Sequence, residues 1–135
     1  MTPQVQALFH AARAAQLHAH APYSKFRVGA AIRSASGVVY AGCNVENAAY
    51  PQGWCAEASA IAAMVTAGEY AIEEVLVISD GAQLSTCCGG CRQKLREFAA
   101  LGTHVHTAGP EGVRRTFTLD ELLPFSFGPE NLDQS

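Results

Sequence analysis

Apolar residues near the start of the chain recur at intervals of three and four, the spacing of one face of an α-helix. This pattern predicts an amphipathic helix over about residues 3–18. Thr2 precedes it as an N-cap, and Pro3 takes the first helical position, where an N–H is not needed. The apolar positions that carry the pattern are Val5, Leu8, Phe9 and Ala12.

The pattern then changes to the two-residue period of a half-buried strand. Apolar residues alternate over residues 28–32, Ser36-Gly37 predicts a tight turn, and residues 38–41 predict a returning strand, so we expect a β-hairpin. Residues 44–54 carry Asn, Pro and Gly and form a long connection. Loops of that length inside a compact domain are usually functional.

The second half of the chain alternates between helical and strand patterns. An Ala-rich segment from Cys55 to Gly68 predicts a helix, and the apolar run from Glu74 to Ser79 predicts a strand covered on both faces. The remaining predicted elements are a helix from Cys88 to near Gly102, strands over 103–107 and 113–118, and a short helix from the capping box Thr118–Glu121 to Pro124. This order predicts an α/β sandwich with helices on both faces of a mixed sheet, in one domain over residues 1–135.

Composition and charge narrow the function classes. The chain has 49% hydrophobic and 16% charged residues, which is enough apolar material for a core and unlike a disordered chain. Its formal net charge is -3, and it contains no run of Lys or Arg. Proteins that track a phosphate backbone normally present a basic face. We therefore expect a small, uncharged substrate and no nucleic-acid partner.

The cysteines point to metal chemistry. The N-terminus lacks a secretory pattern and no segment approaches the roughly 20 apolar residues that span a bilayer, so we expect a cytoplasmic location and no membrane partner. In a reducing compartment, five cysteines are metal ligands or reactive thiols more often than disulfide partners. They are Cys43, Cys55, Cys87, Cys88 and Cys91.

Two motifs stand at predicted helix starts, Cys55-Ala56-Glu57 and Cys88-Gly-Gly-Cys91. Helix N-termini favour thiolates, and three protein ligands with an open fourth position describe a catalytic zinc, which lowers the pKa of water from about 15.7 toward 7. Glu57 lies two residues after a ligand, a spacing that suits a proton shuttle. Zinc-dependent base deaminases are known for this combination of motifs.

With these motifs the chain resembles the small, zinc-dependent, homotetrameric form of the cytidine deaminase family. The segments that carry the resemblance are Tyr23-Ser-Lys-Phe26-Arg-Val-Gly-Ala-Ala-Ile32, Gly42-Cys-Asn44-Val-Glu46-Asn47-Ala48, Cys55-Ala-Glu57, Cys88-Gly-Gly-Cys91-Arg-Gln93 and Glu121-Leu-Leu-Pro124. The resemblance implies a three-layer α/β/α sandwich with a mixed five-stranded sheet. It also implies hydrolytic conversion of cytidine and deoxycytidine to uridine and deoxyuridine with release of ammonia, a reaction of pyrimidine salvage.

The resemblance also implies roles for individual residues. One zinc per subunit would be held by the three cysteines of the two motifs, with Glu57 as the catalytic carboxylate. The implied substrate contacts are Phe26 beside the base, Asn44 and Glu46 at the ribose hydroxyl groups, the backbone of Ala56 at the base carbonyl, and the carbonyl of Thr86 at the leaving amine. Tyr50 and Phe127 would complete a neighbour's site, so the homotetramer would share its active sites and an isolated subunit would be inactive.

Two positions depart from the family pattern. Ala58 stands where the family commonly has an arginine that hydrogen-bonds the zinc thiolates, and Cys87 replaces a proline. A zinc ion with three thiolates carries a net charge of about -1, so without the arginine we expect a poorer Lewis acid. Helix N-termini, Arg27 or Arg92 would have to compensate.

Other interpretations remain open. The same chemistry on a modified cytosine nucleoside or on a blasticidin S-type aminopyrimidine antibiotic is the nearest alternative, followed by a nucleic-acid editing deaminase. A structural zinc module would use Cys43 or Cys87 as a fourth ligand, and a thioredoxin-like redox role is the most remote. Asn44 and Glu46 also suit a turn, Phe127 suits a local core, and we expect surface positions for His104 and His106.

Overall fold

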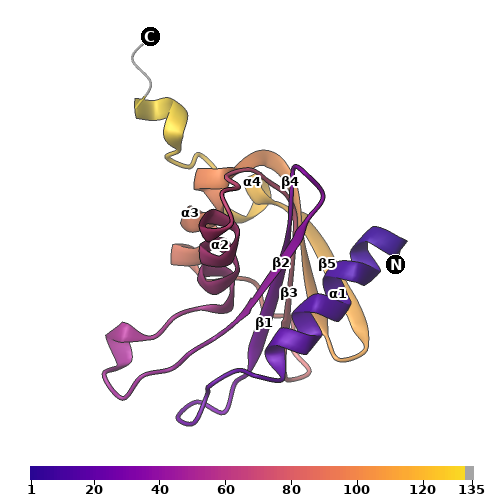
Figure 1. Cartoon of the computed structure of the whole chain (residues 1–135), viewed down its shortest axis with the longest axis vertical. Coiled ribbons are helices and arrows are strands. Elements are labelled where there is room, and N and C mark those ends of the chain that lie inside the picture. The colour runs from indigo at the N-terminus through magenta and orange to yellow at the C-terminus, as the bar shows by residue number, and fades with distance from the viewer. Residues whose placement is uncertain (133–135) are drawn as a thin grey trace.

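A mixed five-stranded sheet runs through the middle of the molecule in the computed structural model, which describes residues 1–132 (Figure 1). Its strands are β1 (Val28–Ser34), β2 (Val39–Cys43), β3 (Ile72–Ser79), β4 (Ala99–Gly109) and β5 (Gly112–Thr118). They lie in the order β2-β1-β3-β4-β5. The β3–β4 pair is parallel, and the β2–β1, β1–β3 and β4–β5 pairs are antiparallel.

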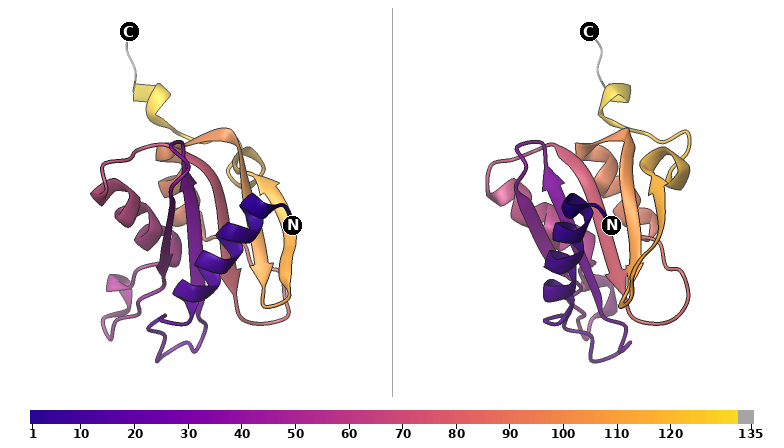
Figure 2. Two further views of the ribbon diagram at one scale, coloured as in Figure 1. Left: turned by 45° about the vertical axis from the view of Figure 1, so that its right-hand side comes forward. Right: turned by 90° about the vertical axis from the view of Figure 1, so that its right-hand side faces the viewer.

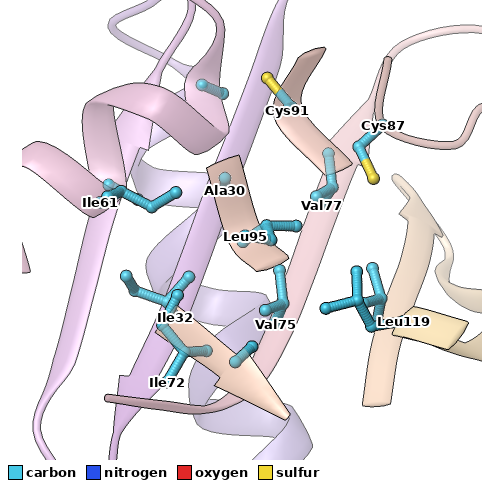
Figure 3. Close-up of a cluster of buried hydrophobic side chains, with 14 of the residues drawn as sticks. Ala30, Ile32, Ile61, Ile72, Val75, Val77, Cys87, Cys91, Leu95 and Leu119 are labelled. Carbon is cyan, nitrogen blue, oxygen red and sulfur yellow. The ribbon is translucent and has the colours of Figure 1, made fainter. Parts of the chain in front are cut away.

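Helices cover both faces of this sheet (Figure 2). Helix α1 (Pro3–Gln16) packs on one face, where Leu8 and Ala12 join a buried cluster with Leu76 and Ile78 of β3. Helices α2 (Ala56–Thr66), α3 (Gly89–Phe98) and the short α4 (Leu119–Leu122) share the core of the other face. Figure 3 shows Ile61 of α2 and Leu95 of α3 against Ile32 and Val75 of the sheet. The predicted three-layer α/β/α sandwich with a mixed five-stranded sheet is confirmed.

Two glycines let helices approach the sheet closely, one on each face. A Cβ atom at Gly29 of β1 would lie 2.0 Å from the carbonyl oxygen of Ala12 in α1. A Cβ at Gly42 of β2 would lie 2.5 Å from the backbone nitrogen of Ala60 in α2. Any side chain at Gly42 would therefore push α2 outward, and with it the helix start that carries Cys55.

The boundary between α3 and β4 differs from the prediction. The helix ends at Phe98, and Ala99 already has extended dihedral angles (φ -124°, ψ 143°). Ala99 is buried and pairs with Ile72 at the start of the parallel β3–β4 ladder. The prediction of a helix to near Gly102 was wrong because strand pairing with a distant segment overrides the local helix propensity of these residues.

The two histidines of β4 differ in exposure. His104 is exposed, as predicted, but His106 is only 6% exposed and the expected surface position was wrong. Its Nε2 lies 2.6 Å from a carboxylate oxygen of Glu74, and its Nδ1 lies 2.7 Å from Oγ1 of Thr116. Both partners come from neighbouring strands, which the sequence spacing of the histidines does not reveal.

Candidate functional site

The start of α2 and the start of α3 lie together because of the strand directions. Strands β2 and β3 are both antiparallel to β1, so they run the same way and end at the same edge of the sheet. The loop after β2 leads to Cys55 and the loop after β3 leads to Cys88, and these two residues are the N-caps of α2 and α3. Both helices then pack on the same face. The two cysteine motifs are thereby brought to one place.

Three sulfur atoms meet there. The Sγ atoms of Cys55, Cys88 and Cys91 all lie within 4.8 Å of one another, and those of Cys55 and Cys88 are 3.9 Å apart. Tetrahedral zinc with Zn–S bonds of about 2.3 Å places its sulfur ligands about 3.8 Å apart, so the donor set fits zinc in both chemistry and spacing. Within residues 1–132, neither Cys43 nor Cys87 belongs to this group. The three-thiol arrangement that we predicted is thus present without a fourth cysteine.

The thiols need a cation in order to ionise together. Burial raises the pKa of Cys55, and burial together with the charges of Glu57 and Cys55 raises that of Cys91. Burial also acts to raise the pKa of Cys88, but hydrogen bonds from Cys91 outweigh it and leave this pKa below its usual value. A bound divalent ion would supply the positive charge that these sulfur atoms lack.

Glu57 lies in the first turn of α2 and is 4% exposed. Burial raises the pKa of its carboxyl group, while the charge of Lys94 acts in the opposite direction. The carboxylate lines the same cavity as Cys55 and Cys88 but is outside the group of clustered ligand atoms. A buried carboxyl with a raised pKa, beside the sulfur cluster and not part of it, is suited to holding and releasing a proton.

A cavity of about 400 Å³ opens beside the sulfur cluster and is large enough for a nucleoside-sized ligand. Most of the residues that the sequence assigned to the site line this cavity. They are Phe26, Asn44, Glu46, Tyr50, Cys55, Ala56, Glu57, Thr86 and Cys88. The assigned residues Cys91 and Phe127 do not line it. Trp54, which does, was missed, although its position directly before Cys55 was a signal for it.

Asn44 and Glu46 hold the loop that leads into β1. The Asn44 side chain accepts a hydrogen bond from the Val28 N–H at 2.9 Å and donates one to the Phe26 carbonyl at 2.9 Å. The Glu46 carboxylate accepts hydrogen bonds from the Ser24 hydroxyl and from the backbone N–H groups of Ser24 and Tyr23, which lowers the pKa of Glu46. The turn-shaping role is thus present in the structure, and both side chains also line the cavity.

Tyr50 and Phe127 are exposed in different settings. Tyr50 is 74% exposed at the rim of the cavity, where its ring contacts Tyr23 edge-on at a centroid distance of 5.6 Å. Phe127 is 56% exposed, and its carbonyl accepts a hydrogen bond of 2.8 Å from Gln93 Nε2 of α3. The guanidinium of Arg96 packs against the adjacent Gly128. These contacts hold the backbone of the segment while the phenyl ring stays in solvent.

The two arginines expected to compensate for Ala58 form hydrogen bonds with other groups. Arg27 donates to the Leu17 carbonyl at 2.6 Å. Arg92 donates to the Cys87 carbonyl at 2.8 Å, to Thr86 Oγ1 at 2.6 Å and to the carbonyl of Leu122 in α4 at 2.7 Å. It therefore holds the loop before Cys88 instead of a thiolate. That clamp was not predicted, because two of its partners are backbone carbonyls and one of these, in Leu122, is remote in the sequence.

Cys87 belongs to the core and not to the sulfur cluster. It is 3% exposed in the cluster that includes Val77 and Leu119 (Figure 3). Burial and the charge of Glu57 raise the pKa of its thiol to about 11. Because its sulfur lies outside the group of clustered ligand atoms, Cys87 acts as a small apolar side chain of the core.

Comparisons with known proteins agree with this geometry. Residues 2–107 match the family model of the cytidine and deoxycytidylate deaminase zinc-binding region. The cytidine deaminase of Sporosarcina psychrophila is 36% identical over 128 residues, covering 95% of this chain and 94% of the relative. That of Mycoplasma pneumoniae is 40% identical over 112 residues, covering 82% of this chain and 84% of the relative.

Solved structures give the same picture. The cytidine deaminase from Burkholderia pseudomallei superposes with a TM-score of 0.85 at 37% identity, covering 94% of this chain and all of that one (100%). The cytidine deaminase from Mycobacterium tuberculosis superposes with a TM-score of 0.77 at 33% identity, covering 91% and 96% of the two chains. Among the helices of residues 1–132, none combines the length and the apolar character that a membrane span requires.

Proposed function

Because the chain belongs to the cytidine and deoxycytidylate deaminase family, we propose that it converts cytidine and deoxycytidine to uridine and deoxyuridine with release of ammonia. The observation that carries this function is the meeting of three thiols and one buried carboxyl group at a nucleoside-sized cavity. A structural zinc module needs a fourth ligand. Within the described residues, no fourth Cys, His, Asp or Glu joins the cluster.

The metal site consists of Cys55, Cys88 and Cys91, one zinc ion per subunit. When bound, zinc supplies a Lewis acid that makes water nucleophilic at neutral pH. The N-terminal turns of α2 and α3 present unpaired N–H groups to the thiolates, which stabilises their charge. The chain therefore contributes both the ligands and part of the compensating field.

Glu57 moves the protons. Its carboxylate accepts a proton from the attacking water and delivers it to N3 of the pyrimidine. It afterwards takes the remaining proton from the hydroxyl group added at C4 and gives it to the amine, so that the C4 carbonyl forms as the C–N bond breaks and ammonia leaves. One carboxyl group serves both transfers because it is buried beside the reacting ring and keeps the proton out of solvent. Its raised pKa brings its proton affinity closer to that of the groups it exchanges protons with.

The remaining contacts orient the nucleoside in the cavity. The ring of Phe26 lies beside the base, the free backbone N–H of Ala56 binds the base carbonyl, and the carbonyl of Thr86 faces the leaving amine. Asn44 and Glu46 bind the ribose hydroxyl groups. All five line the cavity, which supports the assignment. The Arg92 clamp on Thr86 and Cys87 keeps the amine-binding carbonyl in place.

Assembly into a homotetramer with shared active sites is part of the proposal. The exposed ring of Phe127, outside its own cavity, supports a role in a neighbour's site. Tyr50 already lines the cavity of its own subunit, so its exposure alone supports a second contact across an interface. A cytoplasmic location and a single catalytic domain over residues 1–135 stay predictions, and residues 133–135 lie outside the described part.

The test is the ultraviolet absorbance change when zinc-loaded protein meets a substrate panel. The panel contains cytidine, deoxycytidine, cytosine, C5- and N4-modified nucleosides and a blasticidin S-type aminopyrimidine. We expect turnover of the first two. Turnover of a modified substrate alone would support the alternative that Ala58 and Cys87 raise, and tightly held zinc without any turnover would favour a structural zinc module.

A further inference from the structure

The loaded metal site carries an excess of negative charge. Binding of Zn²⁺ by three thiols releases three protons and leaves a centre of net charge -1, next to the carboxyl group of Glu57. The residue after Glu57 is Ala58, which is 8% exposed, so α2 places no cationic side chain at this position. The cation that balances the centre must come from another element.

The two arginines that the sequence offered as compensating cations are already engaged. Arg27 donates a hydrogen bond to the Leu17 carbonyl, and the guanidinium of Arg92 donates to the loop at Thr86–Cys87 and to α4. Arg92 therefore occupies the side of α3 that faces α4. A counter-charge supplied by α3 would have to come from the opposite side of this helix.

Lys94 projects from that opposite side. Two residues after Arg92, it is rotated by about 200° around the helix, and helical side chains lean toward the N-terminus. Its Nζ lies 3.7 Å from the point where a Cβ of Gly90 would be. Gly90 stands between Cys88 and Cys91 in the sequence, so the ammonium group lies over the first turn of α3. Within residues 1–132, no carboxylate forms an ion pair with Lys94.

A second feature agrees with this placement. Lys94 is also the charged group that counteracts the effect of burial on the pKa of Glu57, so its field reaches the start of α2 as well as that of α3. The ammonium group therefore lies over the helix start that carries Cys88 and Cys91, and its charge acts on the carboxyl group of Glu57.

We propose that Lys94 is the counter-charge of the zinc–thiolate centre, acting as a positioning residue at the rim and touching neither substrate nor metal. The inference rests on the proposed function, since it presumes that the three thiols hold zinc. It predicts that Lys94 stabilises the zinc-loaded state relative to the metal-free state, because only the loaded centre carries a net negative charge. Because the Lys94 side chain is exposed to solvent, its electrostatic effect must weaken as the salt concentration rises.

The experiment compares zinc affinity among three variants of the full chain, measured by competition with a chromogenic chelator at low and high salt. Lys94→Met removes the charge and keeps most of the length, while Lys94→Arg restores the charge. Arg115→Met is the matched control, because it removes one exposed positive charge on the edge strand β5, where the guanidinium lies over the ring of Phe117. Thermal unfolding of the metal-free variants checks that each is folded.

We expect Lys94→Met to weaken zinc affinity by about three- to tenfold at low salt and by about twofold or less at high salt. Lys94→Arg should restore most of the affinity, and Arg115→Met should match the original chain. Equal affinity of Lys94→Met and the original chain, a loss that salt does not change, or an equal loss in Arg115→Met would overturn the inference. Failure of the original chain to bind zinc would instead overturn the proposed function itself.

Discussion

The two faces of the sheet bury titratable groups in opposite ways. On the α1 face, Glu74 accepts a hydrogen bond from Arg33 at 2.8 Å and is bound to His106 at 2.6 Å, while Thr116 contacts the second ring nitrogen of His106. Arg33 also donates to the Gln4 carbonyl of α1 at 2.6 Å. Every member of this group has a partner within the fold.

On the other face, within residues 1–132, Glu57 and the clustered cysteines have no ion-pair partner. Burial raises the pKa of Cys55, Cys91 and Glu57, and these residues lie at or beside an open cavity. Burial of an ionisable group therefore does not by itself mark a functional site. A group whose charge is satisfied by its neighbours contributes to stability, whereas one left short of a counter-charge beside a cavity is prepared for a ligand.

The largest effect that separates the two faces is expected from Glu57→Gln. This change keeps the shape of the side chain but removes its capacity to carry a proton, so kcat should fall by about a thousandfold. Zinc content, measured by atomic absorption, should stay at one ion per subunit. The exposed Glu97 of α3 provides the control, since Glu97→Gln should keep normal turnover. Near-normal kcat in Glu57→Gln would refute the assignment of the proton shuttle.

The corresponding change on the α1 face should affect stability and not catalysis. Glu74→Ala leaves Arg33 and His106 without their shared acceptor, which should lower the free energy of unfolding by about 2 kcal/mol. At a temperature at which the variant is folded, we expect its kcat/KM to stay within about twofold of that of the original chain, because Glu74 lies across the sheet from the cavity. Urea unfolding of Glu74→Ala beside Glu73→Ala, its exposed neighbour on β3, measures the difference. A large loss of kcat with unchanged stability would contradict the comparison.

Arg92→Met tests how far the catalytic face depends on support from neighbouring segments. The variant loses the three hydrogen bonds that join Thr86, Cys87 and Leu122, and we expect about a tenfold lower kcat with zinc retained. Arg92→Lys should not restore activity, since an ammonium group cannot reproduce the planar fork of a guanidinium. Recovery of activity in the lysine variant would mean that charge, and not geometry, is what Arg92 supplies.

The smallest expected effect is a pH dependence of stability that distinguishes Glu57 from the satisfied carboxylates. Burial raises the pKa of Glu57 in the metal-free protein, so the folded state holds this proton more tightly than the unfolded state. The free energy of unfolding must therefore fall as pH rises from the ordinary glutamate pKa through the raised value.

Glu57→Gln cannot lose that proton, so its stability relative to the original chain should increase across the same pH window and then level off. Urea unfolding in the presence of a chelator, at a series of pH values, measures this difference, and Glu97→Gln should run parallel to the original chain. A difference that does not change with pH would show that the carboxyl group is not held in its protonated form by burial.

Local patterns predicted most elements and their order correctly. The Thr2 N-cap, the Thr118–Glu121 capping box and the stop at Gly68 are all present, the last with a φ of +87°. These features depend on residues three or four apart, which the sequence displays directly. The predictions for the end of α3 and for the exposure of His106 were wrong, because both features depend on strand partners remote in the sequence.

The chemistry of the site can be read from the chain alone. A CxE motif and a CxxC motif, each at a helix start, specify soft ligands and one carboxylate through local spacing alone. That these ligands meet follows from the fold, because the common direction of β2 and β3 brings two distant loops to one edge of the sheet. The fold also sets which cations serve the site. The reach of Arg92 and Lys94 depends on which neighbours α3 packs against, and packing between distant segments is not encoded in any short window of residues.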